Sequence, residues 1–244
     1  MVVYVDCWSA TKGLIERQVL RVLYSPVKAF EEIAETPNFK GPLLIFALIM
    51  LATAGAQYVS ASKILLETNG EYVCLFTSTS FGGLVVSSLI NTAVHFFINW
   101  MMYAAVLFLI IKVSRIKTGP WAVFYVIIGY VFSVTIVYAL ANIALISALP
   151  SINLPPVAWK AWDPQATNEE AQAAREIINQ KLQENWYPLW AFQALPYLSY
   201  AIDVWTAALC AIAIRSSYEV TWSKAIAISA IATVIVLFLR TFIP

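Results

Sequence analysis

Charged residues are scarce in this sequence, and their scarcity indicates the class of protein. Only 12% of the 244 residues are Asp, Glu, Lys or Arg, whereas soluble globular domains contain roughly 25%. The chain is 61% hydrophobic with a mean hydropathy of +0.74, and its apolar residues form long blocks. This composition excludes an ordinary soluble domain and favours lipid as the solvent. A net charge of +1 gives no support for nucleic acid as a partner.

The residues that usually carry catalysis or bind cofactors are also few. A single histidine, His95, cannot supply a bis-histidine haem or a histidine-rich metal centre. The three cysteines have no metal-ligand spacing, and no pair of them is placed to suggest a disulfide. Gly82-Gly83 is not followed by the Lys-Ser/Thr of a phosphate-binding loop, and no Gly-x-Ser-x-Gly motif occurs. We therefore expect no cofactor, no metal and no enzymatic activity.

Five apolar blocks are long enough to cross a membrane. Roughly 20 apolar residues at 1.5 Å per residue cross a hydrocarbon core of about 30 Å. The predicted spans are residues 43–62, 84–111, 121–149, 189–214 and 222–242. The first residues, MVVYVDCWSATKG, lack a basic start followed by an apolar core, so we expect no cleavable signal peptide. The sequence predicts an all-α polytopic membrane protein, a bundle of five transmembrane helices with an N-terminal amphipathic interfacial helix.

Residues 1–42 are expected to form a cytoplasmic amphipathic arm and a membrane-entry elbow, ahead of a five-span domain over residues 43–244. Ser25-Pro26 is typical of a helix start, and Pro37 is expected to end that helix. The arm either lies on the membrane surface or packs on the cytoplasmic loops of the protein itself. The candidate contacts with lipid or a partner are Arg17, Arg21, Lys28 and Phe30.

The longest predicted segment outside the membrane is an outer loop at about residues 150–187. Thr167 followed three residues later by Glu170 is a capping-box signature and predicts a helix start. Trp159 and Trp162 are further candidate contacts, because tryptophan concentrates where a membrane meets water.

Lysine and arginine are distributed unequally between the two sides of the predicted membrane. Ten of the 15 lie on the side of the N-terminus and five on the other. The positive-inside rule therefore predicts a cytoplasmic N-terminus and an outer C-terminus. The charge-free part of the fifth span ends just before Arg240, and we expect this side chain to snorkel outwards.

The segment from Tyr24 to Leu44 resembles the start of prokaryotic members of the Yip family of membrane proteins. The resemblance is carried by Ser25-Pro26, Phe30, Ile33, Pro37 and Gly41-Pro42-Leu43-Leu44. It implies a cytoplasmic N-terminus followed by five spans, which agrees with the number of apolar blocks, and it implies a multi-pass protein of a prokaryotic cell membrane. Eukaryotic relatives act in vesicle trafficking and bind small GTPases through a longer cytoplasmic region.

Polar residues recur every four positions along the second predicted span: Ser87, Asn91, His95 and Asn99. This spacing places them on one stripe of one helix, and such a stripe must face protein or water because burying it in lipid is costly. Asp203 is the only carboxylate deep in a predicted span, at a depth similar to that of His95. We hypothesise that His95 and Asp203 approach each other, directly or through an asparagine or a water.

This polar group has two interpretations. It is either a proton relay or polar substrate site, or a structural clamp that holds the second and fourth spans together. We expect an interaction or scaffold protein, a subunit of a membrane complex or a self-associating protein, with the lipid bilayer and other membrane proteins or itself as partners. The alternative is a small transporter or channel-like protein that uses the His95/Asp203 site.

Overall fold

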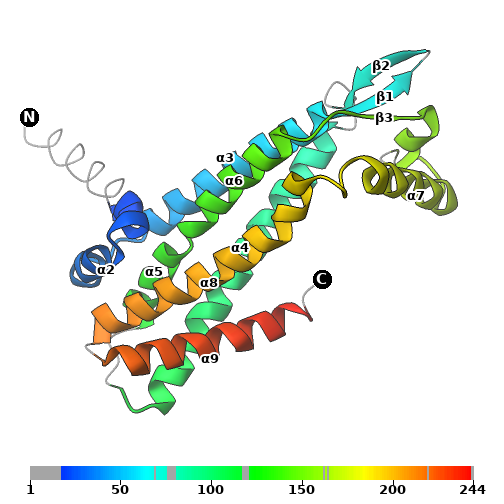
Figure 1. Ribbon diagram of the computed structural model, residues 1–244. Coiled ribbons are helices and arrows are strands. Elements are labelled where there is room, and N and C mark those ends of the chain that lie inside the picture. Colours follow the sequence, from blue (N-terminus) through cyan, green and yellow to red (C-terminus); the bar gives the residue numbers. More distant parts are fainter. Residues whose placement is uncertain are drawn as a thin grey trace, which may run out of the picture. The chain divides into compact units, whose positions relative to one another are not determined.

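The computed structural model describes residues 18–68, 70–75, 81–116, 121–161, 163, 165–218 and 220–242. Helices dominate this part of the chain (Figure 1). The helices are α2 (Pro26–Glu35), α3 (Lys40–Ser62), α4 (Phe81–Val113), α5 (Trp121–Val131), α6 (Val134–Ser147), α7 (Asn168–Asn185), α8 (Trp190–Tyr218) and α9 (Trp222–Arg240), with the 3-10 helix η2 at Pro156–Ala161. The strands are β1 (Ile64–Thr68), β2 (Glu71–Cys74) and β3 (Ile152–Leu154). Residues 18–24 are also helical.

Five helical segments are long and apolar enough to cross a membrane, which confirms the predicted number of spans. They are Lys40–Ser62, Gly82–Val113, Trp121–Ser147, Trp190–Tyr218 and Trp222–Arg240. The third differs in detail from the single helix that was expected, because it consists of α5 and α6. Between them the backbone bonds shorten to three-residue steps, such as Ser133 N–H to the Tyr130 carbonyl at 3.1 Å, which is the tighter 3-10 spacing.

The chain divides into two compact units. Unit 1 comprises Met1–Ile49, Ala93–Val137 and Tyr200–Pro244, and unit 2 comprises Met50–Thr92 and Tyr138–Ser199. The core of unit 1 is built around large buried side chains, among them Phe30 on α2, Trp100 and Tyr103 on α4, and Tyr130 on α5. The helical residues 18–24 and α2 both precede the first span in unit 1 and are too short to cross a membrane, so unit 1 contains the segment predicted as the elbow.

The elbow between α2 and α3 is fixed by close contacts with α5. The Tyr130 hydroxyl lies 3.2 Å from the Asn38 carbonyl oxygen and 3.2 Å from Gln18 Oε1. A Cβ atom on Gly41 would lie 2.0 Å from that hydroxyl, and one on Gly129 would lie 2.6 Å from Pro42 Cγ. Only glycine fits at these two positions, because real Cβ atoms do not approach other atoms so closely. The Asn38 side chain also accepts a hydrogen bond from the Lys40 backbone N–H at 2.9 Å, at the start of α3.

Unit 2 contains a small three-stranded sheet, which the predicted all-α fold does not include. The strand order is β2-β1-β3, with β1 antiparallel to β2 and parallel to β3. Gly70 has a φ of 84° in the tight β1–β2 connection, and the preceding residue makes this an Asn-Gly hairpin signal. Ile152 N–H donates to the Lys63 carbonyl at 2.7 Å, which joins the segment after α6 to the end of α3.

The helix α7 packs on η2 and β3 within unit 2 (Figure 1). The predicted capping box is confirmed: the Thr167 side chain accepts from Glu170 N–H, and the Glu170 carboxylate accepts from Thr167 N–H. Trp186 anchors the far end, because its indole N–H donates to the Pro150 carbonyl at 2.9 Å. These contacts order the loop that was expected at residues 150–187.

Candidate functional site: an intramembrane ion pair and a polar cleft

The strongest polar cluster inside the spans joins three helices of unit 1. Arg240 at the end of α9 donates from Nη1 to Asp203 Oδ1 on α8 at 3.0 Å. The same guanidinium donates from Nε to Asn99 Oδ1 on α4 at 2.7 Å. Asn99 Nδ2 in turn donates to the His95 backbone carbonyl at 2.8 Å. The charges are therefore paired, and the asparagine is held in place by its own helix.

An aromatic ring completes the surroundings of the guanidinium. The Cζ atom of Arg240 lies 5.8 Å from the centroid of the Tyr103 ring, within the range of a cation–π contact. Tyr103 is fully buried, one helical turn after Asn99 on α4. The Arg240 and Asp203 side chains are 32% and 21% exposed, so the pair is half-buried in the protein. The Asp203 carboxylate, the Asn99 amide and the Tyr103 ring together stabilise the positive charge of Arg240.

Helix length explains why these three residues meet. At 1.5 Å per residue, Asp203 lies about 22 Å along α8 from its end at Tyr218, and Arg240 lies about 27 Å along α9 from its start. Asn99 lies about 21 Å from the end of α4. The helices α8 and α9 are joined by only a few residues, so they run antiparallel from a shared turn. Arg240 therefore reaches the level of Asp203.

Two charged groups, Arg240 and Asp203, make a contact that was not expected. Arg240 was expected to snorkel outwards, but it extends along the protein to Asp203 and Asn99 because α9 is short. Asp203 was expected to approach His95 directly or through an asparagine or a water; in the described part of the chain its carboxylate pairs with Arg240, and Asn99 links Arg240 to the His95 backbone carbonyl. The His95 imidazole makes no hydrogen bond to any described residue, and only its backbone carbonyl joins the cluster, through Asn99. Counting residues along α8 and α9 from the turn that joins them would have identified Arg240 as the partner of Asp203.

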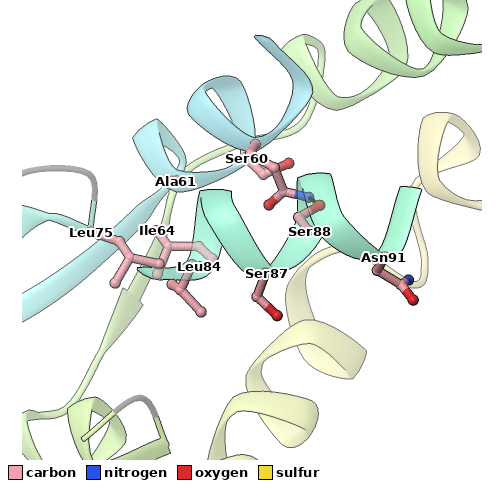
Figure 2. A pocket seen from close by; sticks show the side chains of 9 residues that line it. Ser60, Ala61, Ile64, Leu75, Leu84, Ser87, Ser88 and Asn91 are labelled. Carbon is pink, nitrogen blue, oxygen red and sulfur yellow. Dashed lines mark hydrogen bonds between the residues drawn. The ribbon is translucent and has the colours of Figure 1, made fainter. Parts of the chain in front are cut away.

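The first half of the predicted stripe belongs to a different feature. Ser87 and Asn91 line a cleft of about 480 Å³ within unit 2, whereas Asn99 belongs to the ion-pair cluster in unit 1. Figure 2 shows the labelled side chains coming from the end of α3, from β1 and the residue after β2, and from the first turns of α4. Gln57 Nε2 donates to Ser88 Oγ at 2.9 Å across the cleft. The lining carries neutral hydrogen-bonding groups and no charged side chain.

The predicted surface contacts have different environments. Phe30 is fully buried in the core of unit 1, so it is not available to lipid or a partner, because α2 turns its apolar face to the protein. Arg21 pairs with Glu32 and Lys28 is exposed. Trp159 is 46% exposed on η2. Arg17 and Trp162 lie outside the described residues.

Outside the spans, two carboxylates on α7, Glu170 and Glu184, have a lowered pKa, and at Glu184 the cause is hydrogen bonds from Lys181 and Gln180. The Lys160 ammonium and the Thr167 backbone N–H both donate to Glu170, and these bonds lower the pKa of its carboxyl group. In the described part of the chain, no group of three His, Cys, Asp or Glu side chains is arranged to hold a metal ion.

The five spanning helices and their paired charges define a polytopic helical membrane protein. The Yip1 domain family matches residues 20–243, which include the elbow and all five spans, and the chain belongs to this family. The resemblance read from Tyr24 to Leu44 is thereby confirmed at the level of the family. No curated protein and no solved structure matches the chain.

Proposed function

We propose that the protein is an integral membrane interaction protein, either a subunit of a larger membrane complex or self-associating, and not an enzyme. The observation that supports this most is that Asp203 and Arg240 form an ion pair with each other inside the protein. A proton relay or ion pathway uses intramembrane ionisable groups that are free to exchange partners. Here the guanidinium has a carboxylate and an amide as partners within the chain, which favours the clamp interpretation.

The proposed contact surface consists of exposed aromatic rings on η2 and around the start of α8. Trp159 is 46% exposed, Tyr187 51% and Trp190 72%. Large aromatic side chains are enriched at protein interfaces and where a membrane meets water. The capping box and the Trp186 anchor hold the neighbouring α7 in place. Such an ordered surface suits docking because little conformational entropy is lost on binding.

Partner capture with matched variants tests this proposal. We expect a stoichiometric partner, or a second copy of the chain, to co-purify from membranes in mild detergent and to be identified by quantitative mass spectrometry. Trp159→Ala should reduce its recovery, whereas Trp222→Ala should not, since Trp222 has nearly the same exposure (47%) at the start of α9. Equal recovery with both variants, or a monomer without a partner, would contradict the proposal.

We further propose that the protein lies in a prokaryotic cell membrane with its N-terminus in the cytoplasm and its C-terminus outside, which the Lys and Arg distribution supports. Single cysteines placed at Lys28 and Glu176, in a background with the native cysteines changed to serine, test the orientation. A membrane-impermeant maleimide should label the cysteine at 176 in intact cells, and the one at 28 only after permeabilisation. The reverse pattern would refute the orientation.

A second candidate is a small transporter or channel-like protein, which the polar cleft of unit 2 supports (Figure 2). Its neutral lining suits an uncharged polar solute better than an ion. Efflux of a small polyol from proteoliposomes tests this candidate. Efflux above that of protein-free vesicles, abolished by Asn91→Leu, would favour it; efflux equal to that of empty vesicles would exclude it for that solute.

A further inference from the structure

A second cleft lies in unit 1, beside α2 and the end of α8. Its volume is about 430 Å³, and it is lined by Glu31, Ala34 and Glu35 from α2 and by Arg215 and Ser216 from α8. The α2 helix immediately precedes the first span, and Arg215 lies in the last turn of the fourth. The cleft is therefore at the membrane edge, on the side that carries the N-terminal arm.

One wall of the cleft has hydrogen-bond donors without an acceptor. Arg215 Nε and Ser216 Oγ, on the two α8 residues that line the cleft, are buried, and neither has a hydrogen-bond partner in the described part of the chain. Leaving buried polar groups unpaired is costly. Arg215 supplies a positive charge here, and this charge must outweigh the partial negative charge at the C-terminal end of α8. Such a wall fits an anionic group with several oxygen acceptors, of which phosphate is the commonest at a membrane edge.

The opposite wall is acidic. Glu31 and Glu35 are exposed on α2, whereas the neighbouring Glu32 is engaged by Arg21. Within the described residues, neither Glu31 nor Glu35 forms an ion pair with Arg215, although all three line the same cleft. Opposite charges that line the same cleft without forming an ion pair leave room for a ligand that carries both a positive and a negative charge.

We propose that this cleft binds the phosphoethanolamine headgroup of phosphatidylethanolamine. The lipid phosphate pairs with the Arg215 guanidinium, and the ammonium donates to Glu31 and Glu35. A choline headgroup has no N–H to donate, and a glycerol headgroup has no positive charge. The site should therefore prefer phosphatidylethanolamine over phosphatidylcholine and phosphatidylglycerol, a selectivity that goes beyond general contact with the bilayer.

Native mass spectrometry of the purified full chain, titrated with each of these three lipids, tests the preference. We expect phosphatidylethanolamine to bind the wild-type protein at least about tenfold more tightly than phosphatidylcholine, because charge-assisted hydrogen bonds from the ammonium are lost with choline. Equal binding of the two lipids would overturn the proposal. Free phosphoethanolamine is added as a competitor; displacement of the lipid at a similar concentration would overturn the lipid assignment and point to a soluble ligand.

Substitutions in the two walls test which wall binds the ammonium and which binds the phosphate. Glu35→Gln should bring the ratio of phosphatidylethanolamine to phosphatidylcholine affinity close to one while keeping phosphatidylcholine binding. Arg215→Gln should weaken all three lipids by a similar factor. The controls Glu176→Gln and Arg175→Gln change exposed charges on α7 and should leave the wild-type ratio unchanged. If Arg215→Gln does not fold, Glu35→Gln decides alone, and a ratio equal to that of Glu176→Gln would refute the site.

Discussion

Replacing Asp203 with asparagine keeps the shape of the side chain but removes the charge opposite Arg240. A fully buried ion pair costs about 3–5 kcal/mol when one partner is removed, and an exposed pair contributes about 0–1 kcal/mol. The two side chains are 21% and 32% exposed, so we expect an intermediate loss of about 2 kcal/mol in the free energy of unfolding. Arg240→Gln should cost at least as much, because it leaves a carboxylate unpaired deep in α8.

Combining the two substitutions distinguishes a clamp from two separate defects. With both charges gone, neither partner is left unpaired, so the double variant should lose about 1–2 kcal/mol less than the sum of the single losses. Thermal unfolding in detergent is the simplest assay. A loss of about 2 kcal/mol in a chain of this size lowers Tm by about 4–8 °C.

The control is His95→Gln, since the imidazole makes no hydrogen bond to a described residue. We expect a change within about 0.5 kcal/mol. If the Asp203 and Arg240 losses add within about 0.5 kcal/mol, the two residues do not act as a pair, and the clamp is refuted. If instead His95→Gln destabilises the protein as much as Asp203→Asn, the imidazole itself stabilises the fold, which contradicts its separation from the ion-pair cluster.

Three further changes test other parts of the fold. Gly129→Ala should destabilise the protein by about 1–3 kcal/mol through overpacking, because the added Cβ would lie 2.6 Å from a proline ring atom. The control is Gly55→Ala, where the Cβ would lie 3.6 Å from its nearest neighbour. This change should be neutral or slightly stabilising in the same thermal assay. Thr167→Ala removes the side-chain acceptor at the start of α7 and should cost about 1 kcal/mol of local helix stability, which hydrogen exchange of α7 measures; unchanged protection would contradict the cap. The lowered pKa of Glu170 means that its ion pair with Lys160 stabilises the folded state above the unfolded-state pKa of about 4.3 and is lost as pH falls through the folded-state pKa. Protection factors in α7, corrected for the intrinsic exchange rate at each pH, should therefore fall at low pH in the wild-type protein, and Lys160→Met should remove most of that pH dependence.

The spans could be predicted from the sequence because each is a property of one continuous segment. An apolar block longer than the hydrocarbon core is sufficient, and the five blocks became five spanning helices. The capping box of Thr167 and Glu170 was also readable, because it depends on four neighbouring residues. The Asn69-Gly70 hairpin signal is equally local, because it depends on two neighbouring residues.

The candidate site was less predictable because it depends on how three helices align along their axes. The four-residue spacing gave the correct helix face for Asn99, but the stripe divides between the unit 2 cleft and the unit 1 ion pair. The charge of Arg240 at the end of an apolar block predicted a side chain that reaches the membrane surface. Its observed partners depend instead on the length of α9 relative to α8. Burial of Phe30 likewise follows from which elements surround α2, and an amphipathic pattern alone does not distinguish protein from lipid.

The position of Arg240 in the chain has a consequence for biosynthesis. The arginine follows Asp203 by 37 residues, and at 5–20 residues per second the ribosome takes about 2–7 s to add them. During this interval α8 carries a carboxylate whose cationic partner has not yet been made. A chain interrupted between α8 and α9 therefore exposes an unpaired intramembrane charge, and such a fragment should be a preferred substrate for membrane quality-control proteases.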